Sequence, residues 1–258
     1  MSLSQDRHAR LLADCAAAIA GGEIDVLFQP QFRVRDGRMI GAEALARWHH
    51  REEGDIAPEM LFLLAAEQGC VPQLTRHVAE RAMQAAAGWS GNLHLSVNIT
   101  PTAVEEPGFV QDFARILGDA GLAPRRLTVE ITEEVLLADV HAAATVLAEL
   151  RALGVAVALD DFGAGFCNFR YLKLLPLTGL KLDRTMVEGI ADDPRDLAVL
   201  RGICATARAL GLEVTVEGIE TAAQLAAIAG EQCDTYQGFL RSPPLSAEDF
   251  AKLAANTS

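Results

Sequence analysis

Hydrophobic and polar positions alternate along the chain in two patterns. From about residue 93 onward, short runs rich in β-branched residues alternate with longer Ala- and Leu-rich stretches whose apolar positions recur at helical spacing. The clearest such stretch, residues 194–210, carries its apolar residues on a single stripe. This alternation is typical of consecutive βα units.

Eight segments have the length and composition of strands: residues 24–32, 39–47, 93–99, 127–132, 155–160, 179–182, 213–217 and 234–237. Eight strands close a (β/α)8 barrel, and about 250 residues is the usual size of that fold. The connection from Arg33 to Arg38 is too short for a crossover helix, so the first two strands must form an antiparallel hairpin that turns at Asp36-Gly37. The sequence therefore predicts an α/β fold, a TIM-like (β/α)8 barrel with an antiparallel first strand.

The chain contains no Pro- or Ser-rich linker and no low-complexity tract, which predicts a single domain over residues 1–258. Residues 1–20 are expected to form an N-terminal helix that leads into the first strand. Its first residues are compatible with a remnant of an expression vector. With 258 residues, 50% of them apolar and 22% charged, the chain is neither disordered nor collagen-like. It can bury about three quarters of its unfolded surface, so a full core needs no disulfide or structural metal.

Charge and cysteine usage narrow the partners and the compartment. Thirty-five acidic and 22 basic residues give a formal net charge of −13, which argues against binding to long nucleic acids or contact of this domain with anionic membranes. No apolar run approaches the ~18 residues that cross a bilayer, and no signal peptide is visible. The five cysteines lack CxxC spacing, which fits a reducing compartment. We therefore expect a cytoplasmic protein, and an anionic substrate would require a bound cation such as a divalent metal.

Polar side chains stand near the C-terminal ends of seven predicted strands. They are Glu43, Asn98, Glu130, Asp160 with Asp161, Lys181, Glu217 and Gln237. In a (β/α)8 barrel these ends converge on one mouth, where the active site lies. A single acid at a strand end is more often a helix cap or an ion-pair partner, about four times in five. Helix caps alone do not explain why seven strands each carry a polar side chain near the C-terminal end. The set therefore predicts one shared site.

This set of side chains predicts bound divalent metal ions. Five carboxylates in a partly dry cleft cannot all stay ionised unless cations lie between them. Oxygen donors without His or Cys suit Mg²⁺ or Mn²⁺ and argue against zinc. Asp160 can face the barrel axis while Asp161 turns back over the mouth, and such a pair can bridge two ions about 3.5–4 Å apart. Two ions at that spacing activate water for phosphoryl displacement, with Lys181 as an added positive charge, so the predicted reaction is phosphodiester hydrolysis.

These residues carry a family resemblance. The segment Glu43-Ala44-Leu45-Ala46-Arg47-Trp48 resembles the signature of EAL-domain cyclic di-GMP phosphodiesterases, and further matches follow in the family's order and spacing at residues 28–30, 96–98, 130–133, 160–163, 181–184, 216–220 and 237–238. The resemblance covers nearly the whole chain. It implies a barrel with an antiparallel first strand, which agrees with the hairpin inferred above. It also implies hydrolysis of cyclic di-GMP to linear 5′-pGpG.

The resemblance further implies individual roles. The ligands of a first metal ion would be Glu43, Asn98, Glu130 and Asp160, and those around a second ion Asp160, Asp161 and Glu217. The catalytic set would comprise Glu217, with Lys181 and Gln237 orienting the nucleophilic water, and Glu133 anchoring the loop of residues 161–169. The substrate site would comprise Arg47, which pairs with a phosphate, together with Gln29, Leu45 and Asp183; Asp183 could equally support the ligands from behind or form an ion pair.

The resemblance also implies cofactors and partners. Two Mg²⁺ or Mn²⁺ ions are expected, and Ca²⁺ is expected to inhibit because its longer, looser coordination disturbs the spacing of the two ions. Cyclic di-GMP is the expected ligand, a homodimer is expected with the loop of residues 161–169 close to the interface, and a sensory or GGDEF-type module could be fused or separate. This loop departs from the family pattern, since Phe166 stands where Tyr is common and Cys167-Asn168 replace two serines.

Two other functions remain open at this point. The chain could be a catalytically weak or inactive receptor of the same fold that binds cyclic di-GMP and signals to a partner. Receptors of that kind are expected to lose ligands, and none is lost here. Alternatively, a barrel that enolises a carboxylate substrate could use three acids for Mg²⁺ and Lys181 as the base. The tandem Asp160-Asp161, Asn98 and Arg47 argue against that reaction.

Overall fold

The computed structural model describes residues 3–132, 135–165 and 169–256. Glu133 and the substituted positions Phe166, Cys167 and Asn168 lie outside these residues. The strands are β1 (Ile24–Arg33), β2 (Met39–His50), β3 (Gly54–Ile56), β4 (His94–Asn98), β5 (Leu127–Ile131), β6 (Ala156–Phe162), β7 (Gly179–Leu182), β8 (Glu213–Val216) and β9 (Thr235–Tyr236). The helices are α1 (Leu3–Gly21), α2 (Pro58–Glu67), α3 (Val71–Ala87), α4 (Pro101–Val104), α5 (Phe109–Ala120), α6 (Val135–Ala152), α7 (Phe169–Leu174), α8 (Pro194–Ala209), α9 (Ala222–Ala229) and α10 (Ala247–Ala255).

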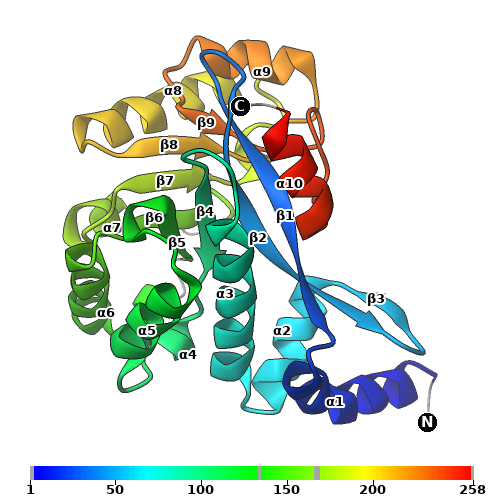
Figure 1. Cartoon of the computed structure of the whole chain (residues 1–258). Coiled ribbons are helices and arrows are strands. Elements are labelled where there is room, and N and C mark those ends of the chain that lie inside the picture. Colours follow the sequence, from blue (N-terminus) through cyan, green and yellow to red (C-terminus); the bar gives the residue numbers. More distant parts are fainter. Residues whose placement is uncertain (1–2, 133–134, 166–168, 257–258) are drawn as a thin grey trace.

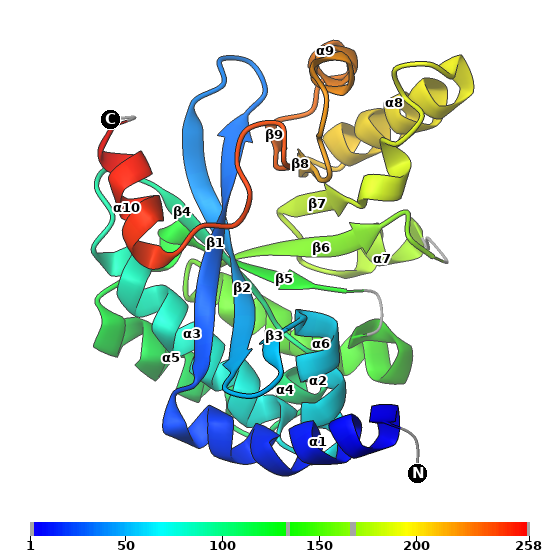
Figure 2. The ribbon, with the colours of Figure 1, turned by 90° about the vertical axis from the view of Figure 1, so that its right-hand side faces the viewer.

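Within the described residues, eight strands close a barrel in the order β1-β9-β8-β7-β6-β5-β4-β2, and β1 pairs with β2 to complete the ring (Figures 1 and 2). The pairings of β1 with β2 and with β9 are antiparallel, whereas the other neighbours around the ring are parallel. The predicted barrel with an antiparallel first strand is therefore confirmed. Each of the eight predicted strands is present; β7 has the predicted bounds, and no strand end differs from its predicted position by more than three residues.

One strand was not expected from the sequence. β3 pairs with the end of β2, so that Trp48 lies opposite Ile56 and His50 opposite Gly54. It extends β2 into a hairpin beside α1 and α2 outside the ring (Figure 1). Three residues of this strand are too few to show the two-residue alternation from which strands are predicted.

Side chains alternate between the helices and the barrel interior along each strand. On β5, Val129 and Ile131 are fully buried toward the surrounding helices, while Thr128 and Glu130 face inward. The same period places an inward residue near the end of each parallel strand, and the register aligns these residues across strands: Asn98 lies opposite Glu130, and Lys181 opposite Thr215. The fold therefore gathers the polar strand ends on the inside of one mouth.

Helix boundaries follow local capping. The Asp193 side chain accepts a hydrogen bond from the backbone N–H of Arg195 at the start of α8, and Thr221 with Gln224 forms a capping box at the start of α9. Helix α10 begins at Ser246, which caps the N–H of Asp249, and it packs along β1 (Figure 2). In the described part of the chain, no helix has the length and apolar character needed to span a membrane.

Candidate active site

The ammonium of Lys181 lies at the centre of the acidic residues. Its Nζ is 2.7 Å from Glu130 Oε2, 2.7 Å from Glu217 Oε1, 3.0 Å from Asp160 Oδ1 and 3.2 Å from Glu43 Oε2. The Lys181 side chain is 2% exposed. Four strands (β2, β5, β6 and β7) and the residue that follows β8 thus bring five charged groups together, as the sequence predicted.

Two amides complete this cluster. Asn98 Nδ2 donates to Glu43 Oε1 at 2.7 Å, and Gln237 Nε2 donates to Glu43 Oε2 at 2.7 Å and to Glu217 Oε1 at 3.0 Å. Gln31 Nε2 in turn donates to Gln237 Oε1 at 3.0 Å, which fixes the orientation of the Gln237 amide. Gln31 was not predicted from the sequence, although its inward position two residues from Gln29 on β1 could have indicated it.

Asp160 and Asp161 both reach the site because β6 is irregular between them. The pairing register of β6 with β7 shifts between Leu159 and Phe162, and Asp161 has a φ of 54°, which non-glycine residues rarely adopt. The break lies within the strand, because β6 continues to Phe162, whereas the sequence placed the strand end at Asp160. The turn of Asp161 back over the mouth is as predicted, and backbone strain of this kind concentrates at functional sites.

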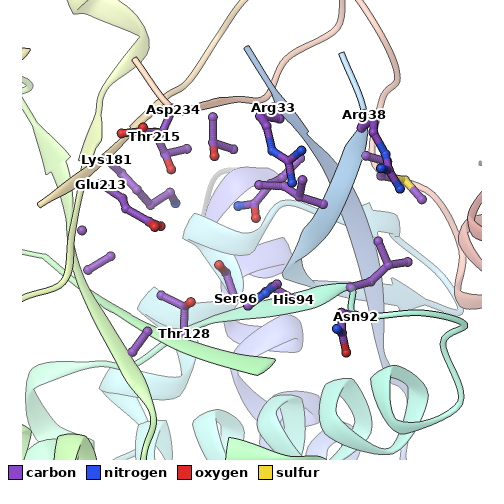
Figure 3. Close-up of a pocket in the computed structure, with 18 of the residues that line it drawn as sticks. Arg33, Arg38, Asn92, His94, Ser96, Thr128, Lys181, Glu213, Thr215 and Asp234 are labelled. Atoms are coloured by element: carbon purple, nitrogen blue, oxygen red, sulfur yellow. The ribbon is translucent and has the colours of Figure 1, made fainter. Parts of the chain in front are cut away.

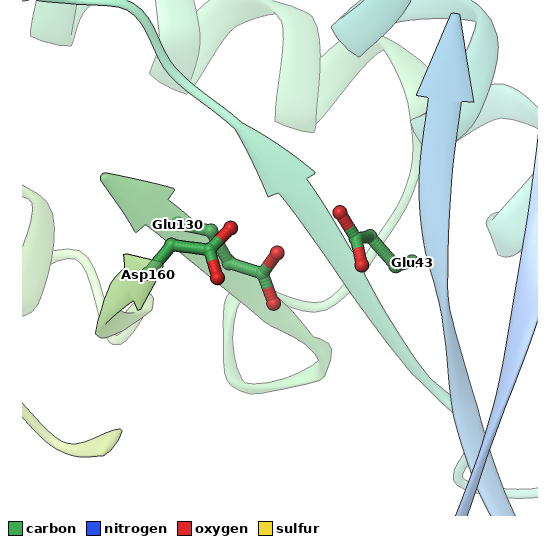
Figure 4. A group of neighbouring side chains, drawn as sticks. All are labelled: Glu43, Glu130 and Asp160. Atoms are coloured by element: carbon green, nitrogen blue, oxygen red, sulfur yellow. The ribbon is translucent and has the colours of Figure 1, made fainter. Parts of the chain in front are cut away.

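The carboxylates form two groups that could each hold a metal ion. One oxygen from each of Glu43, Glu130 and Asp160 lies within 4.8 Å of the others, and the same holds for Asp160, Asp161 and Glu217. Figure 4 shows the carboxylates of the first group pointing into a common space from three strands. Because all of these donors are oxygens, the residues fit hard divalent cations. The two groups share Asp160, the arrangement expected for two neighbouring ions.

Burial and mutual repulsion shift the pKa values of these groups. Burial raises the pKa of Glu217 to about 8, with further increases from Glu43 and Asp160, and it raises that of Asp161 to about 6 with help from Asp160. Burial opposes the Lys181 ammonium, but the surrounding carboxylates outweigh it and hold its pKa well above the ordinary value. One lysine therefore does not neutralise the cluster, and the remaining negative charge favours cation binding.

The residues predicted to bind substrate have different surroundings. Glu43, Leu45 and Arg47 alternate along β2 on one face, and Gln29 lies opposite Glu43 on β1. Gln29 Nε2 donates to the backbone carbonyl of Ser242 at 2.6 Å. Arg47 is partly exposed and forms no ion pair among the residues the structure describes. Its guanidinium is available to an anion.

Asp183 is partly occupied by a local role. Its Oδ1 accepts hydrogen bonds from the Thr185 backbone N–H at 2.9 Å and from the Thr185 hydroxyl at 2.6 Å, which caps the short 3₁₀ turn Arg184–Met186. This capping contact is local to the turn and involves none of the carboxylates of the acidic cluster. Its remaining oxygen is the only part of the carboxylate left for a substrate in the described surroundings.

A cavity of about 800 Å³ lies inside the opposite end of the barrel. It is lined by residues at the strand starts, including Ala156, and it extends to Glu130 and Lys181 of the acidic cluster. Figure 3 shows His94, Glu213 and Lys181 among the lining residues. Arg33 and Arg38 lie across from Asp234 and Glu213 in this view. The interiors of such barrels are normally filled by branched apolar side chains. Here small or hydroxyl-bearing inward residues leave the space open, a pattern readable from the strands but not recognised in the sequence.

The fold and the cluster define a TIM-like barrel with an acidic, oxygen-donor site at the C-terminal ends of its strands. Residues 13–244 match the sequence pattern of the EAL domain, and the chain belongs to this family. The family expected from the sequence is therefore confirmed. The chain spans 30% to 42% of the length of the curated relatives that it matches.

Relatives of this chain include named enzymes. The bifunctional diguanylate cyclase/cyclic di-GMP phosphodiesterase MucR of Pseudomonas aeruginosa is 33% identical over 252 residues, which cover 96% of this chain and 37% of that protein. The cyclic di-GMP phosphodiesterase PA2567 of the same organism is 32% identical over 249 residues, covering 95% of this chain and 42% of that protein.

Solved structures share the fold. The structure of the PaMucR phosphodiesterase in complex with c-di-GMP matches with a TM-score of 0.87 and 33% identity, covering 93% of this chain and 99% of that one. The EAL enzyme Bd1971 with cAMP and cyclic-di-GMP bound matches with a TM-score of 0.91 and 26% identity, covering 98% of this chain and 70% of that one.

Proposed function

We propose that this chain is a divalent-metal-dependent phosphodiesterase that hydrolyses cyclic di-GMP to linear 5′-pGpG by a two-metal mechanism. The observation that carries the proposal is the pair of three-carboxylate groups that share Asp160 around Lys181. The c-di-GMP bound in the structure of a relative with 33% identity supports the choice of substrate.

The ligand sets follow the two groups. Glu43, Asn98, Glu130 and Asp160 would hold one ion, and Asp160, Asp161 and Glu217 the other. Asn98 would bind through its carbonyl oxygen, since its amide nitrogen already donates to Glu43. When bound, the ions would supply Lewis acidity to the phosphate and activate water at neutral pH. Mg²⁺ or Mn²⁺ fits this role, and Ca²⁺ should inhibit because its coordination is longer and looser.

The protein groups around the ions would orient the reactants. Lys181 offers a positive charge, and Gln237, held by Gln31, offers an amide beside Glu43 and Glu217 with which to position the nucleophilic water. Arg47 would bind a substrate phosphate. Gln29, Leu45 and Asp183 would line the dinucleotide site, and Glu133 would anchor the loop of residues 161–169. These roles derive from the family resemblance, and that of Glu133, which lies outside the described residues, rests on the resemblance alone.

The proposal extends to the setting of the domain. We propose that residues 1–258 act as one domain, in the cytoplasm, as a homodimer whose contact includes the loop of residues 161–169. A sensory or GGDEF-type module, fused or separate, would control it, and the bifunctional relative MucR supports this part of the proposal.

Turnover of cyclic di-GMP tests the proposal directly. Purified protein with Mg²⁺ or Mn²⁺ should convert the cyclic dinucleotide into the linear one, and Glu43→Ala should abolish this conversion. A Glu59→Ala variant on the exposed start of α2 is the matched control and should retain full activity. Undiminished hydrolysis by Glu43→Ala would refute the metal assignment.

A second function is favoured by one sequence observation, the replacement of the usual Tyr and two serines by Phe166, Cys167 and Asn168. If these changes disable catalysis, the chain would act as a receptor that binds cyclic di-GMP without cleaving it. Tight binding by calorimetry, with no linear product after long incubation at saturating Mn²⁺, would establish that function in place of the first.

A further inference from the structure

The fold brings together two cysteines that are far apart in the sequence. Cys204 lies on α8 and Cys233 in the turn before β9, and their Sγ atoms are 3.4 Å apart. Both thiols are free, and the residues are 3% and 8% exposed. A disulfide requires an S–S distance of about 2.05 Å, so the sulfurs need to approach by roughly 1.4 Å. Rotation of the two side chains about their Cα–Cβ bonds moves the sulfurs over distances of this order.

Polar contacts around the two cysteines hold the two segments against each other. Arg201 on α8 donates to both carboxylate oxygens of Glu231, at 2.7 and 2.6 Å. One turn beyond Cys204, Arg208 donates to the backbone carbonyl of Gln232 at 3.1 Å. The ion pair and the hydrogen bond flank Cys204 along α8 and hold this helix against the two residues that precede Cys233. The pair is therefore preorganised for a bond between the sulfurs.

One of the two cysteines borders an internal cavity. Cys233 lines the cavity of about 800 Å³ at the end of the barrel opposite the acidic cluster. The cavity is large enough for a compact polar oxidant such as hydrogen peroxide.

We propose that Cys204 and Cys233 are an oxidation site, at which a peroxide converts the two thiols into a reversible intramolecular disulfide. Peroxide first oxidises the Cys233 thiol to a sulfenic acid and releases one water. The Cys204 sulfur then attacks the Cys233 sulfur, the S–S bond forms, and the departing hydroxide takes up the Cys204 proton as a second water. The two thiols lose two electrons and two protons in total, and one peroxide is reduced to two waters. A small dithiol reverses the reaction by thiol–disulfide exchange and is itself oxidised.

The hydrogen bond between the sulfurs makes the two thiols unequal. It lowers the pKa of Cys204 and raises that of Cys233, where burial acts in the same direction. Cys204 is therefore the better nucleophile for the second step. The first step is slow because Cys233 is seldom ionised, so millimolar peroxide is the appropriate reagent.

Peptide mapping of the full chain tests the proposal. The protein is treated with millimolar hydrogen peroxide, quenched with catalase, alkylated under denaturing conditions and digested without reductant. We expect most chains to contain a linkage between the peptides of Cys204 and Cys233, and dithiothreitol to restore both free thiols. Cys204→Ser and Cys233→Ser should each lose the linkage.

Cys15→Ser is the matched control, because Cys15 is another buried free cysteine and lies on α1, apart from α8 and β9. This variant should retain the linkage between Cys204 and Cys233. The proposal is overturned if both cysteines remain open to alkylation, if Cys233 accumulates as sulfinic acid, or if the linkage joins other cysteines. Should a serine variant fail to fold, the map of the unmodified sequence decides alone.

Discussion

Lys181 Nζ lies 2.7 Å from Glu130 Oε2, and each side chain is only 2% exposed. An isolated buried ion pair contributes little net stability, because both charges lose their hydration. Lys181 differs from an isolated partner because Glu43, Asp160 and Glu217 also lie within 3.2 Å of its ammonium. Removing this single cation would leave several carboxylates facing one another in a buried space.

Lys181→Met should therefore destabilise the metal-free protein. Loss of one partner from a buried charge pair costs about 3–5 kcal/mol, because the remaining charge is uncompensated. Urea unfolding at pH 7 without divalent ions measures this change. Lys252→Met is the control, since Lys252 is exposed on α10 and its solvent-screened ion pairs with Glu248 and Asp249 should contribute little to stability. Equal free energies of unfolding for the two variants would contradict the central role of Lys181.

The stability of the metal-free protein should fall as the pH rises from about 5 to 8. Burial raises the pKa of Glu217 to about 8 in the folded chain, against an ordinary value of 4.5 for a solvated glutamate. Between these values the folded state holds a proton that the unfolded state has released, so increasing pH favours unfolding. Thermal melting across this range should show the decline. Glu217→Gln should reduce the slope, and an unchanged slope in that variant would assign the effect to other groups.

Gly238→Ala should disturb the site through the backbone. Gly238 follows Gln237 and has a φ of 153°, and an added Cβ would overlap the backbone of Ile219. Relief of such overpacking costs about 1–3 kcal/mol and would displace the Gln237 amide from Glu43 and Glu217. We expect both a lower melting temperature and a loss of turnover.

Gly230→Ala is the matched substitution. Gly230 ends α9, where an added Cβ would meet only the Ala227 carbonyl oxygen at 3.8 Å. This variant should melt and turn over like the unmodified chain. A similar loss in both variants would show that Gly238 has no special place in the site.

Local patterns account for much of the fold. Alternation along each strand and the short connection at Asp36-Gly37 were enough to predict the eight-stranded ring and its antiparallel first strand. The grouping of Glu43, Glu130 and Lys181 followed from the rule that parallel strands end at one mouth. These features depend on residues close in sequence or on the symmetry of the fold.

Other features depend on contacts that no local pattern encodes. The irregularity in β6 that brings the side chains of both Asp160 and Asp161 to the site arises from pairing with β7. The hydrogen bond from Gln31 to Gln237 forms because β9 closes the ring beside β1. The contact between Cys204 and Cys233 joins residues 29 positions apart. CxxC spacing detects only neighbours in sequence, so the cysteines were interpreted as scattered.

Arg47→Ala should weaken binding of cyclic di-GMP. A hydrogen bond to a charged group is worth about 1.5–3 kcal/mol, which corresponds to roughly a 10- to 100-fold increase in Kd. Calorimetry with Ca²⁺ present measures binding without turnover. Arg51→Ala is the control, because Arg51 is 73% exposed and its nearest acidic oxygen, on Asp14, is 3.9 Å away. Equal affinities of the two variants would exclude a phosphate contact by Arg47.

The two carboxylate groups predict different effects of single substitutions on metal binding. Titration with Mn²⁺ should detect two ions per chain, and Asp161→Asn should weaken only one of them, because Asp161 belongs to a single group. Asparagine also tolerates the positive φ of 54° at this position, so the bulge should persist.

Glu130→Gln should weaken binding of the other ion, and Asp160→Asn should weaken binding of both, since its carboxylate belongs to both groups. Each of these substitutions should lower the affinity for the ion by about 10- to 100-fold or more. Changes to residues that only hydrogen-bond to metal ligands already have effects of that size. If Asp160→Asn removes one ion and leaves the other at full affinity, Asp160 does not bridge two ions, and a two-metal mechanism at this site fails.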